Sequence, residues 1–316
     1  MLFRSGRGAA ISTVVDLLRV ARPQFLVSGL AVFVFGAAWA VLEGAPFDVH
    51  RMVAAYVVLL PAHLSVSYSN DAFDLEADRF GRPTLISGGS GVLVRRPNLR
   101  RVTLWIAFLL HATSLVGGLA FQLMYADSWA LFVFVLIGNA LAWWYTAPPL
   151  QLVYRGFGEI GLALSIGGLI PGYGLLAAGG SLKLETLWLG LALVLFGLAF
   201  VLAVQIPDLE ADRLGGKRTW VVQHGRRPAF RLMTLALALA TLVLFSTPAW
   251  ARAGSTVDTG VLGLLSLLPI GVSALALSRH LEERRTSTLA AHAILVALVA
   301  FCALADGYLL LLLVRD

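Results

Sequence analysis

Apolar residues in this chain occur in long, nearly uninterrupted stretches, without the regular alternation or narrow apolar stripe of soluble elements. A helix that spans a membrane needs about 20 predominantly apolar residues. Nine stretches meet this requirement, at approximately 24–42, 52–70, 102–122, 129–147, 159–179, 186–206, 230–250, 260–278 and 289–313. The connectors leave no room for a separate soluble domain. The pattern predicts an all-α polytopic membrane protein, a single domain over 1–316, with nine transmembrane helices.

The composition agrees with this interpretation. Hydrophobic residues make up 59% of the chain and charged residues 13%, whereas soluble domains have roughly 45–50% and about 25%. The single cysteine, Cys302, lies in an apolar stretch, which excludes a disulfide framework and a cysteine metal site. No small-residue cleavage site follows a short apolar region near the N-terminus, so we expect no removable signal peptide.

The basic residues indicate an orientation. A net charge of +6 would also suit a nucleic-acid-binding protein, but 20 of the 24 Lys and Arg residues fall on alternate connectors, beginning with the N-terminal segment. Cytoplasmic connectors carry this excess in membrane proteins. We therefore expect an integral protein of the cell inner or plasma membrane, with a cytoplasmic N-terminus, an external C-terminus and no nucleic-acid partner.

The hexapeptide DLEADR occurs twice, at 74–79 and 208–213, and a glycine follows two residues after each copy, at Gly81 and Gly215. Both copies lie at the cytoplasmic end of an even-numbered predicted helix. Internal repeats in membrane proteins often place a binding site between the two halves. The repeat therefore favours a site that faces the cytoplasm.

The spacing of the acids in these copies indicates a metal site. Asn70, Asp74 and Asp78 share one helix face at i, i+4 and i+8, and Asp208 and Asp212 form the matching pair. Like charges at this spacing repel one another unless a cation binds between them. Mg²⁺ prefers oxygen ligands and usually combines one or two carboxylates with water and substrate phosphates. We expect these five residues to be Mg²⁺ ligands around a diphosphate.

Residues suited to binding a diphosphate or an acceptor lie beside the acids. Arg82 and Lys217 follow the first and second motif, and both residue types bind phosphate oxygens. Tyr145 and Arg155, in the aromatic-rich third inner connector, are expected to contact the diphosphate or an acceptor. The Ser-Gly-Gly-Ser-Gly stretch at 87–91 is either a mobile lid or a flexible turn.

These motifs together resemble the signature of the UbiA superfamily of intramembrane prenyltransferases. The resemblance rests on N-D-x-x-D-x-x-x-D at 70–78, D-x-x-x-D at 208–212, Y-T-x-P-P at 145–149 and G-K-R-T at 216–219. The S-G-G-S-G and Y-R-G-x-G-E stretches look closest to the MenA-like branch, which prenylates 1,4-dihydroxy-2-naphthoate on the way to menaquinone. The family implies nine helices around a central cavity, a cytoplasmic polar cap and two Mg²⁺ ions on the Asn/Asp motifs.

The resemblance also implies a reaction, in which an allylic polyprenyl diphosphate ionises and a lipid-soluble, aromatic acceptor captures the cation. Asp74, Asp208 and Lys217 are the expected catalytic residues because negative charge develops on the leaving diphosphate near them. Asp71 is the candidate for orienting or deprotonating the acceptor. A hydrocarbon-lined chamber would hold the isoprenoid tail and exclude water.

Two alternatives remain at this stage. Acidic clusters also occur in divalent cation transporters, but these need acids near the middle of the membrane, whereas the five key Asp residues lie at one face. Within the same enzyme class, the acceptor could be 4-hydroxybenzoate, an ether-lipid glycerol phosphate, a chlorin or a haem, or the protein could be a terpene cyclase with no acceptor.

A few polar residues lie within the predicted spans. Asp306 in the ninth stretch is costly in lipid, so it is either functional or close to the outer surface and far from the chemistry. His63, His111, Asn139 and Gln205 are expected to form hydrogen bonds between helices. The glycine pairs at 117–118 and 167–168 indicate close helix packing.

Overall fold

The computed structural model describes residues 3–81, 87–125, 129–247 and 256–315, and within these ranges the chain folds entirely into helices and connecting loops. Eight helical segments are long and apolar enough to cross a membrane, and Ala130–Trp144 is a shorter apolar helix. The all-helical membrane fold is confirmed, and the prediction of nine spanning segments is approximately right when this shorter helix is counted. The uninterrupted ones are α2 (Gln24–Leu42), α3 (Val49–Phe73), α6 (Arg100–Tyr125), α7 (Ala130–Trp144), α11 (Leu184–Gln205), α14 (Arg226–Phe245) and α18 (Arg284–Arg315).

The two remaining segments are interrupted helices. The first consists of α9 (Gly158–Leu164), a π-helical turn over Ser165–Leu169 and α10 (Ile170–Ala177). Pro171, which has no backbone N–H to donate, lies just after the π turn, and single π turns are common where a helix lines a functional site. The second consists of α16 (Thr259–Leu265) and α17 (Leu267–Leu277), which join at Ser266.

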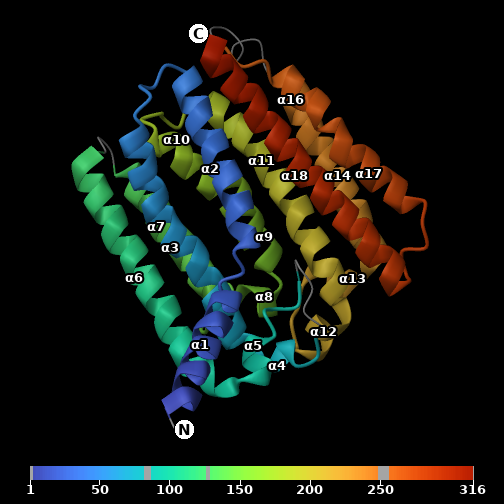
Figure 1. Ribbon diagram of the computed structural model, residues 1–316. Helices are drawn as coiled ribbons and strands as arrows, with labels where there is room; N and C mark the ends of the chain where they lie inside the picture. Colours follow the sequence, from blue (N-terminus) through green and yellow to red (C-terminus); the bar gives the residue numbers. More distant parts are fainter. Residues whose placement is uncertain (1–2, 82–86, 126–128, 248–255, 316) are drawn as a thin grey trace.

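Short helices gather at one end of the bundle. Figure 1 shows this end beside the N-terminus, with the C-terminus at the opposite end. The short helices are α4 (Leu75–Asp78), α5 (Val92–Arg95), α8 (Leu152–Arg155), α12 (Leu209–Leu214) and α13 (Trp220–His224). Both DLEADR copies therefore lie in one polar cap, because an even number of spans separates them.

A helix that the apolar stretches do not predict, α1 (Phe3–Val20), precedes the first span. Its apolar residues are spaced for one face of a helix and are mixed with polar residues, so it fails the criterion of 20 apolar residues in a row. The Tyr68 hydroxyl donates to the Leu17 carbonyl over 3.0 Å, and Arg96 forms an ion pair with Asp16 over 2.8 Å. These contacts attach α1 to α3 and to the cap.

Glycines allow the backbones of neighbouring spans to approach closely. A Cβ atom on Gly36 would lie 1.9 Å from the Pro171 carbonyl oxygen, and one on Gly174 would lie 2.2 Å from the Phe33 carbonyl oxygen. Gly167, expected from the sequence to be a packing residue, faces the Leu193 carbonyl in the same way. Helix α2 thus packs directly against α10, and this contact closes one side of the central cavity.

Replacing Gly174 with Ala is expected to destabilise the protein by about 1–3 kcal/mol, the typical cost of forcing atoms into a packed interior. The methyl group would collide with a backbone carbonyl, which cannot rotate away as a side chain can. Thermal unfolding in detergent measures the change. Gly190→Ala is the matched control, because no atom lies within 4 Å of a Cβ at that position. Equal melting temperatures for the two variants would contradict the prediction.

Candidate active site

Each DLEADR copy begins at a break in a spanning helix. Helix α3 ends at Phe73, Asp74 adopts φ −88° and ψ 5°, and α4 follows; Asp208 adopts φ −95° and ψ 1° before α12. The helical geometry used to group the acids is therefore interrupted at the first Asp of each copy. Backbone hydrogen bonds from Asp74 to Asn70 and from Asp78 to Asp74 nevertheless preserve the helical spacing, so the acids of the first motif stay near one another.

The two copies pack against each other as a symmetric pair. A Cβ atom on Gly215 would lie 2.4 Å from the Cβ of Ala77, and one on Gly81 would lie 3.7 Å from the Cβ of Ala211. Each glycine thus faces the alanine of the other copy. The close approach to Ala77 requires a glycine at position 215, whereas at position 81 a Cβ would make only ordinary van der Waals contacts. The packing of the two copies brings the carboxylates of the two halves to one place.

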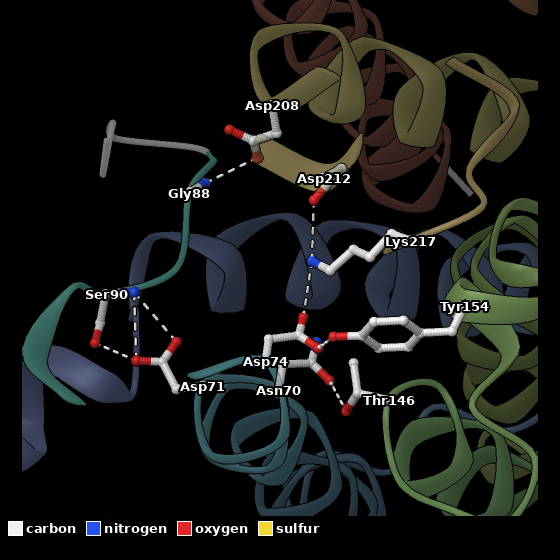
Figure 2. A network of polar contacts seen from close by, with 10 residues as sticks. All are labelled: Asn70, Asp71, Asp74, Gly88, Ser90, Thr146, Tyr154, Asp208, Asp212 and Lys217. Atoms are coloured by element: carbon white, nitrogen blue, oxygen red, sulfur yellow. Dashed lines mark hydrogen bonds and ion pairs between the residues drawn. The ribbon is translucent and has the colours of Figure 1, made fainter. Parts of the chain in front are cut away.

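Lys217 bridges the two acidic motifs. Its Nζ atom lies 2.9 Å from Asp74 Oδ2 and 3.1 Å from Asp212 Oδ1, and its side chain is only 12% exposed. Figure 2 shows the ammonium group between the two carboxylates, one from each half of the chain. Although burial disfavours the charge, the carboxylates of Asp74 and Asp212 raise the pKa of Lys217 well above its usual value. The position between the motifs therefore stabilises a cation.

Two residues that the sequence analysis did not select support the first motif. Tyr154 donates from its hydroxyl to Asp74 Oδ1 over 2.8 Å, and Thr146 donates to Asn70 Oδ1 over 3.0 Å (Figure 2). The neighbouring Arg155, expected to bind substrate, instead donates to the Pro149 carbonyl at an exposed position and does not line the cavity. The side chain of this connector that contacts Asp74 is Tyr154, and the substrate contact expected of Arg155 stays a prediction.

The Ser-Gly-Gly-Ser-Gly segment lies across both motifs. The Gly88 N–H donates to Asp208 Oδ2 over 2.9 Å, the Ser90 N–H donates to Asp71 Oδ1 over 3.1 Å, and the Ser90 hydroxyl also donates to Asp71 (Figure 2). Positive φ angles at Gly88, Gly89 and Gly91 allow this path. Residues 87–91 thus form a glycine-rich cap over the acids, separate from the polar cap of short helices, and hydrogen bonds to Asp71 and Asp208 hold it in place. Arg82, expected nearby, lies outside the described residues.

Replacing Gly89 with Ala is expected to lower activity about tenfold or more. The φ angle of Gly89 is +64°, and a Cβ atom there would lie 2.2 Å from Asp78 Oδ2, so the methyl group would displace either the cap or the carboxylate. Steady-state turnover measures the effect. Gly44→Ala is the control for backbone strain alone, since Gly44 has a φ of +95° and open space around it. An active Gly89→Ala variant would show that the cap can shift freely.

A cavity of about 300 Å³ lies below the acids, inside the membrane-spanning region. Its polar end includes all six Asn and Asp side chains of the two motifs, together with Tyr145 and Lys217. Away from the acids the wall is mostly apolar, with Val32, Leu59, Phe134, Ile166 and Phe200 among its residues. The site therefore combines an anionic mouth with a hydrocarbon-lined interior, as expected for a substrate with a charged head and an apolar tail.

The donor atoms at the mouth suit a hard divalent cation, although the carboxylates do not meet at one point. Among the described residues, no three His, Cys, Asp or Glu side chains converge closely enough to hold a metal by themselves. Mg²⁺ does not need such a cage when phosphate and water complete its shell. Burial and the neighbouring Asp74 raise the pKa of Asp78 to about 8. Both effects disfavour the ionised carboxylate, and a divalent cation at the motifs would favour it again, so Mg²⁺ binding would be linked to deprotonation of Asp78.

The other intramembrane polar residues divide into two groups. His111 and Asn139 form a 2.8 Å hydrogen bond between α6 and α7, as expected from the sequence. His63 and Gln205 do not form the expected hydrogen bonds between helices in the described part of the chain. Both line the cavity, and the amide of Gln205 has no hydrogen-bond partner there. Asp306 does not line the cavity, so the structure separates it from the acidic motifs.

Comparison with known proteins agrees with this geometry. Residues 30–303 match the UbiA prenyltransferase family, and the chain belongs to it. It is thus a prenyltransferase by class. The chain is 22% identical over 225 residues to the 1,4-dihydroxy-2-naphthoate octaprenyltransferase of Bacillus subtilis (strain 168), covering 71% of this chain and 70% of that protein. It is 28% identical over 251 residues to the protein of the same name in Mycobacterium leprae (strain TN), covering 74% and 79%.

Among solved structures, a UbiA homolog from Archaeoglobus fulgidus bound to GPP and Mg²⁺ has the same fold. The TM-score is 0.67 at 18% sequence identity, and the alignment covers 94% of this chain and 99% of that chain. At this identity the similarity establishes the fold alone. It agrees with the helical bundle and central cavity found here.

Proposed function

We propose that this protein transfers a polyprenyl group from an allylic polyprenyl diphosphate to an aromatic quinone precursor of the 1,4-dihydroxy-2-naphthoate type, with Mg²⁺ as the cofactor. The observation that carries the proposal is the meeting of two acidic motifs, one from each half of the chain, at the mouth of an apolar intramembrane cavity. The names of the two relatives support the acceptor, and the Archaeoglobus fulgidus structure with GPP and Mg²⁺ supports the donor and the cofactor.

The residues of the mouth would bind the diphosphate. Asn70, Asp74 and Asp78 on one side and Asp208 and Asp212 on the other would hold Mg²⁺, which neutralises charge on the diphosphate and stabilises it as a leaving group. Their oxygens are already positioned by the two helix breaks. Holding these groups before the substrate arrives reduces the reorganisation needed in the transition state.

Lys217 would change partners when the donor binds. In the structure its ammonium group is held by Asp74 and Asp212. A bound diphosphate would offer it oxygens with developing negative charge, so its contribution would be largest in the transition state. Tyr145, at the cavity wall, would donate a further hydrogen bond because burial raises the pKa of its hydroxyl and keeps it protonated.

The cavity below the mouth would protect the allylic cation. Its apolar wall excludes water, which would otherwise capture the cation before the acceptor does. The 87–91 segment, bonded to Asp71 and Asp208, would close the mouth from the aqueous side. Since Asp71 is held by Ser90, we expect it to act after this cap shifts, by orienting or deprotonating the acceptor.

We also propose that the mouth faces the cytoplasm, with the N-terminus on the same side and the C-terminus outside. The distribution of Lys and Arg supports this orientation, as does the location of both motifs at the end of the bundle near the N-terminus (Figure 1).

The experiment that tests the function uses purified protein with Mg²⁺, geranylgeranyl diphosphate and 1,4-dihydroxy-2-naphthoate, and detects the prenylated product by mass. Product that requires both Mg²⁺ and acceptor would support the proposal. Diphosphate release without this product would retain the ionisation chemistry and reject the acceptor; 4-hydroxybenzoate, an ether-lipid glycerol phosphate, a chlorin and a haem would then be compared. Absence of diphosphate release across several donor lengths would reject the proposal, and divalent cation flux in liposomes would be measured next.

A further inference from the structure

Two groups of polar side chains line the cavity. Lys217 and Tyr145 belong to the mouth described above. Arg22, just before α2, and His63, in the middle of α3, line the same cavity without belonging to the acidic motifs. No step of the reaction proposed above uses this second group.

Arg22 is held in an unusual conformation at the junction of α1 and α2. Its φ angle is +47°, which a residue with a side chain rarely adopts and which is frequently found at functional sites. The guanidinium lies 4.6 Å from the centre of the Phe25 ring, and Nη2 is buried with no hydrogen-bond partner in the described part of the chain. A positioned cation with a free donor is suited to an anionic ligand.

In the described ranges, the carboxylates near Arg22 do not form an ion pair with its guanidinium. Asp71 and Asp208 lie close enough to act on its charge, but neither forms an ion pair with it within 4.0 Å, so far as the described residues show. Both carboxylates instead accept hydrogen bonds from the 87–91 segment. A divalent cation bound at Asp208 would offset part of the negative charge that acts on Arg22. The guanidinium is therefore available to an anion other than the diphosphate.

His63 supplies a second polar contact deeper in the same wall. It lies seven residues before Asn70, which corresponds to two helical turns or about 10 Å along α3. Gly29 makes room for it, since a Cβ atom at Gly29 would lie 2.3 Å from His63 Nδ1. No hydrogen bond of the imidazole is found within the described ranges. It can therefore exchange a hydrogen bond with a ligand hydroxyl.

We infer that the α2–α3 wall, defined by Arg22, Phe25 and His63, is the binding site for an aromatic acceptor that carries a carboxylate beside ring hydroxyls. The carboxylate pairs with Arg22, the ring packs beside Phe25, and a hydroxyl bonds to His63. This inference rests on the proposed function, because only prenyl transfer requires a second substrate below the diphosphate.

The test measures acceptor binding without turnover. Purified protein is titrated with 1-hydroxy-2-naphthoate, a stable carboxylated probe, by calorimetry in the absence of donor. Arg22→Gln is expected to weaken binding about tenfold or more, the effect of losing a charge-assisted hydrogen bond. Arg19→Gln is the matched control, because Arg19 lies on the same segment with 64% of its side chain exposed. Equal affinities for wild type and Arg22→Gln, or no binding to either, would overturn the inference.

Kinetics with a pair of acceptors separate this site from the diphosphate site. Wild type is expected to prefer 1,4-dihydroxy-2-naphthoate over 1,4-dihydroxynaphthalene, and Arg22→Gln should lose that preference while its donor KM changes less than twofold. His63→Phe should raise KM for both acceptors. A rise in donor KM with the preference intact would assign Arg22 to the diphosphate and overturn the inference. Failure of wild type to prenylate any acceptor would refute the proposed function, whereas the calorimetric result would still decide the binding site.

Discussion

Replacing either Asp74 or Asp208 with Asn is expected to lower the kcat of prenyl transfer by about 100-fold or more. The two residues hold corresponding positions at the helix breaks of the two motifs, and each contributes a carboxylate to the cavity mouth. Removing one preorganised group that stabilises transition-state charge typically costs a factor of this size. The substitution keeps the shape of the side chain, so Tyr154 retains an oxygen as its hydrogen-bond acceptor at position 74.

Turnover of donor and acceptor at saturating Mg²⁺ measures this effect, with melting temperature as a check on folding. Glu76→Gln is the matched control: Glu76 belongs to the same hexapeptide, its side chain is 76% exposed, and within the described ranges it forms an ion pair with Arg79 alone. Its kcat should stay within a factor of about two, since exposed ion pairs contribute little. If all three variants turned over equally, the acids would have no special role in the reaction.

The transmembrane architecture could be predicted from the sequence because a bilayer imposes a simple requirement. Each span needs about 20 apolar residues, and α2 begins and ends at the predicted residues 24 and 42. Helix α1 was missed because its apolar residues are mixed with polar ones and form no stretch of about 20 apolar residues. The break of α3 at Asp74 was missed for another reason: helical spacing predicts neighbouring side chains, but it does not reveal a local change in backbone direction.

The acidic residues of the site could be predicted because their spacing and their repetition in DLEADR carry the signal. Tyr154 and Arg22 could not, because their roles depend on contacts between segments far apart in the chain: Tyr154 reaches Asp74 across 80 positions. The choice of Arg155 over Tyr154 followed from charge, which favours an arginine near phosphate. In the structure the arginine turns to the Pro149 carbonyl, and the less conspicuous tyrosine reaches the acids.

Replacing Lys217 with Met is expected to change the affinities for Mg²⁺ and for the donor in opposite directions. Without donor, the Lys217 ammonium group lies between Asp74 and Asp212 and competes with a divalent cation for their oxygens. Its removal leaves both carboxylates buried and unpaired, so Mg²⁺ should bind about tenfold more tightly. The donor should bind about tenfold more weakly, because the diphosphate loses a cationic partner.

Calorimetric titration with Mg²⁺ alone, followed by titration with a nonhydrolysable diphosphate analogue at saturating Mg²⁺, measures the two affinities separately. Arg218→Met is the matched control: it removes the same charge from the neighbouring, exposed position, and neither affinity should change more than about twofold. If Lys217 had a purely structural role, its removal would lower the affinities for Mg²⁺ and for the diphosphate analogue together, because a loosened site would bind each of them less well. Opposite changes in Lys217→Met that are absent in Arg218→Met are expected if the lysine contacts the metal-binding carboxylates in the free protein and the diphosphate in the complex.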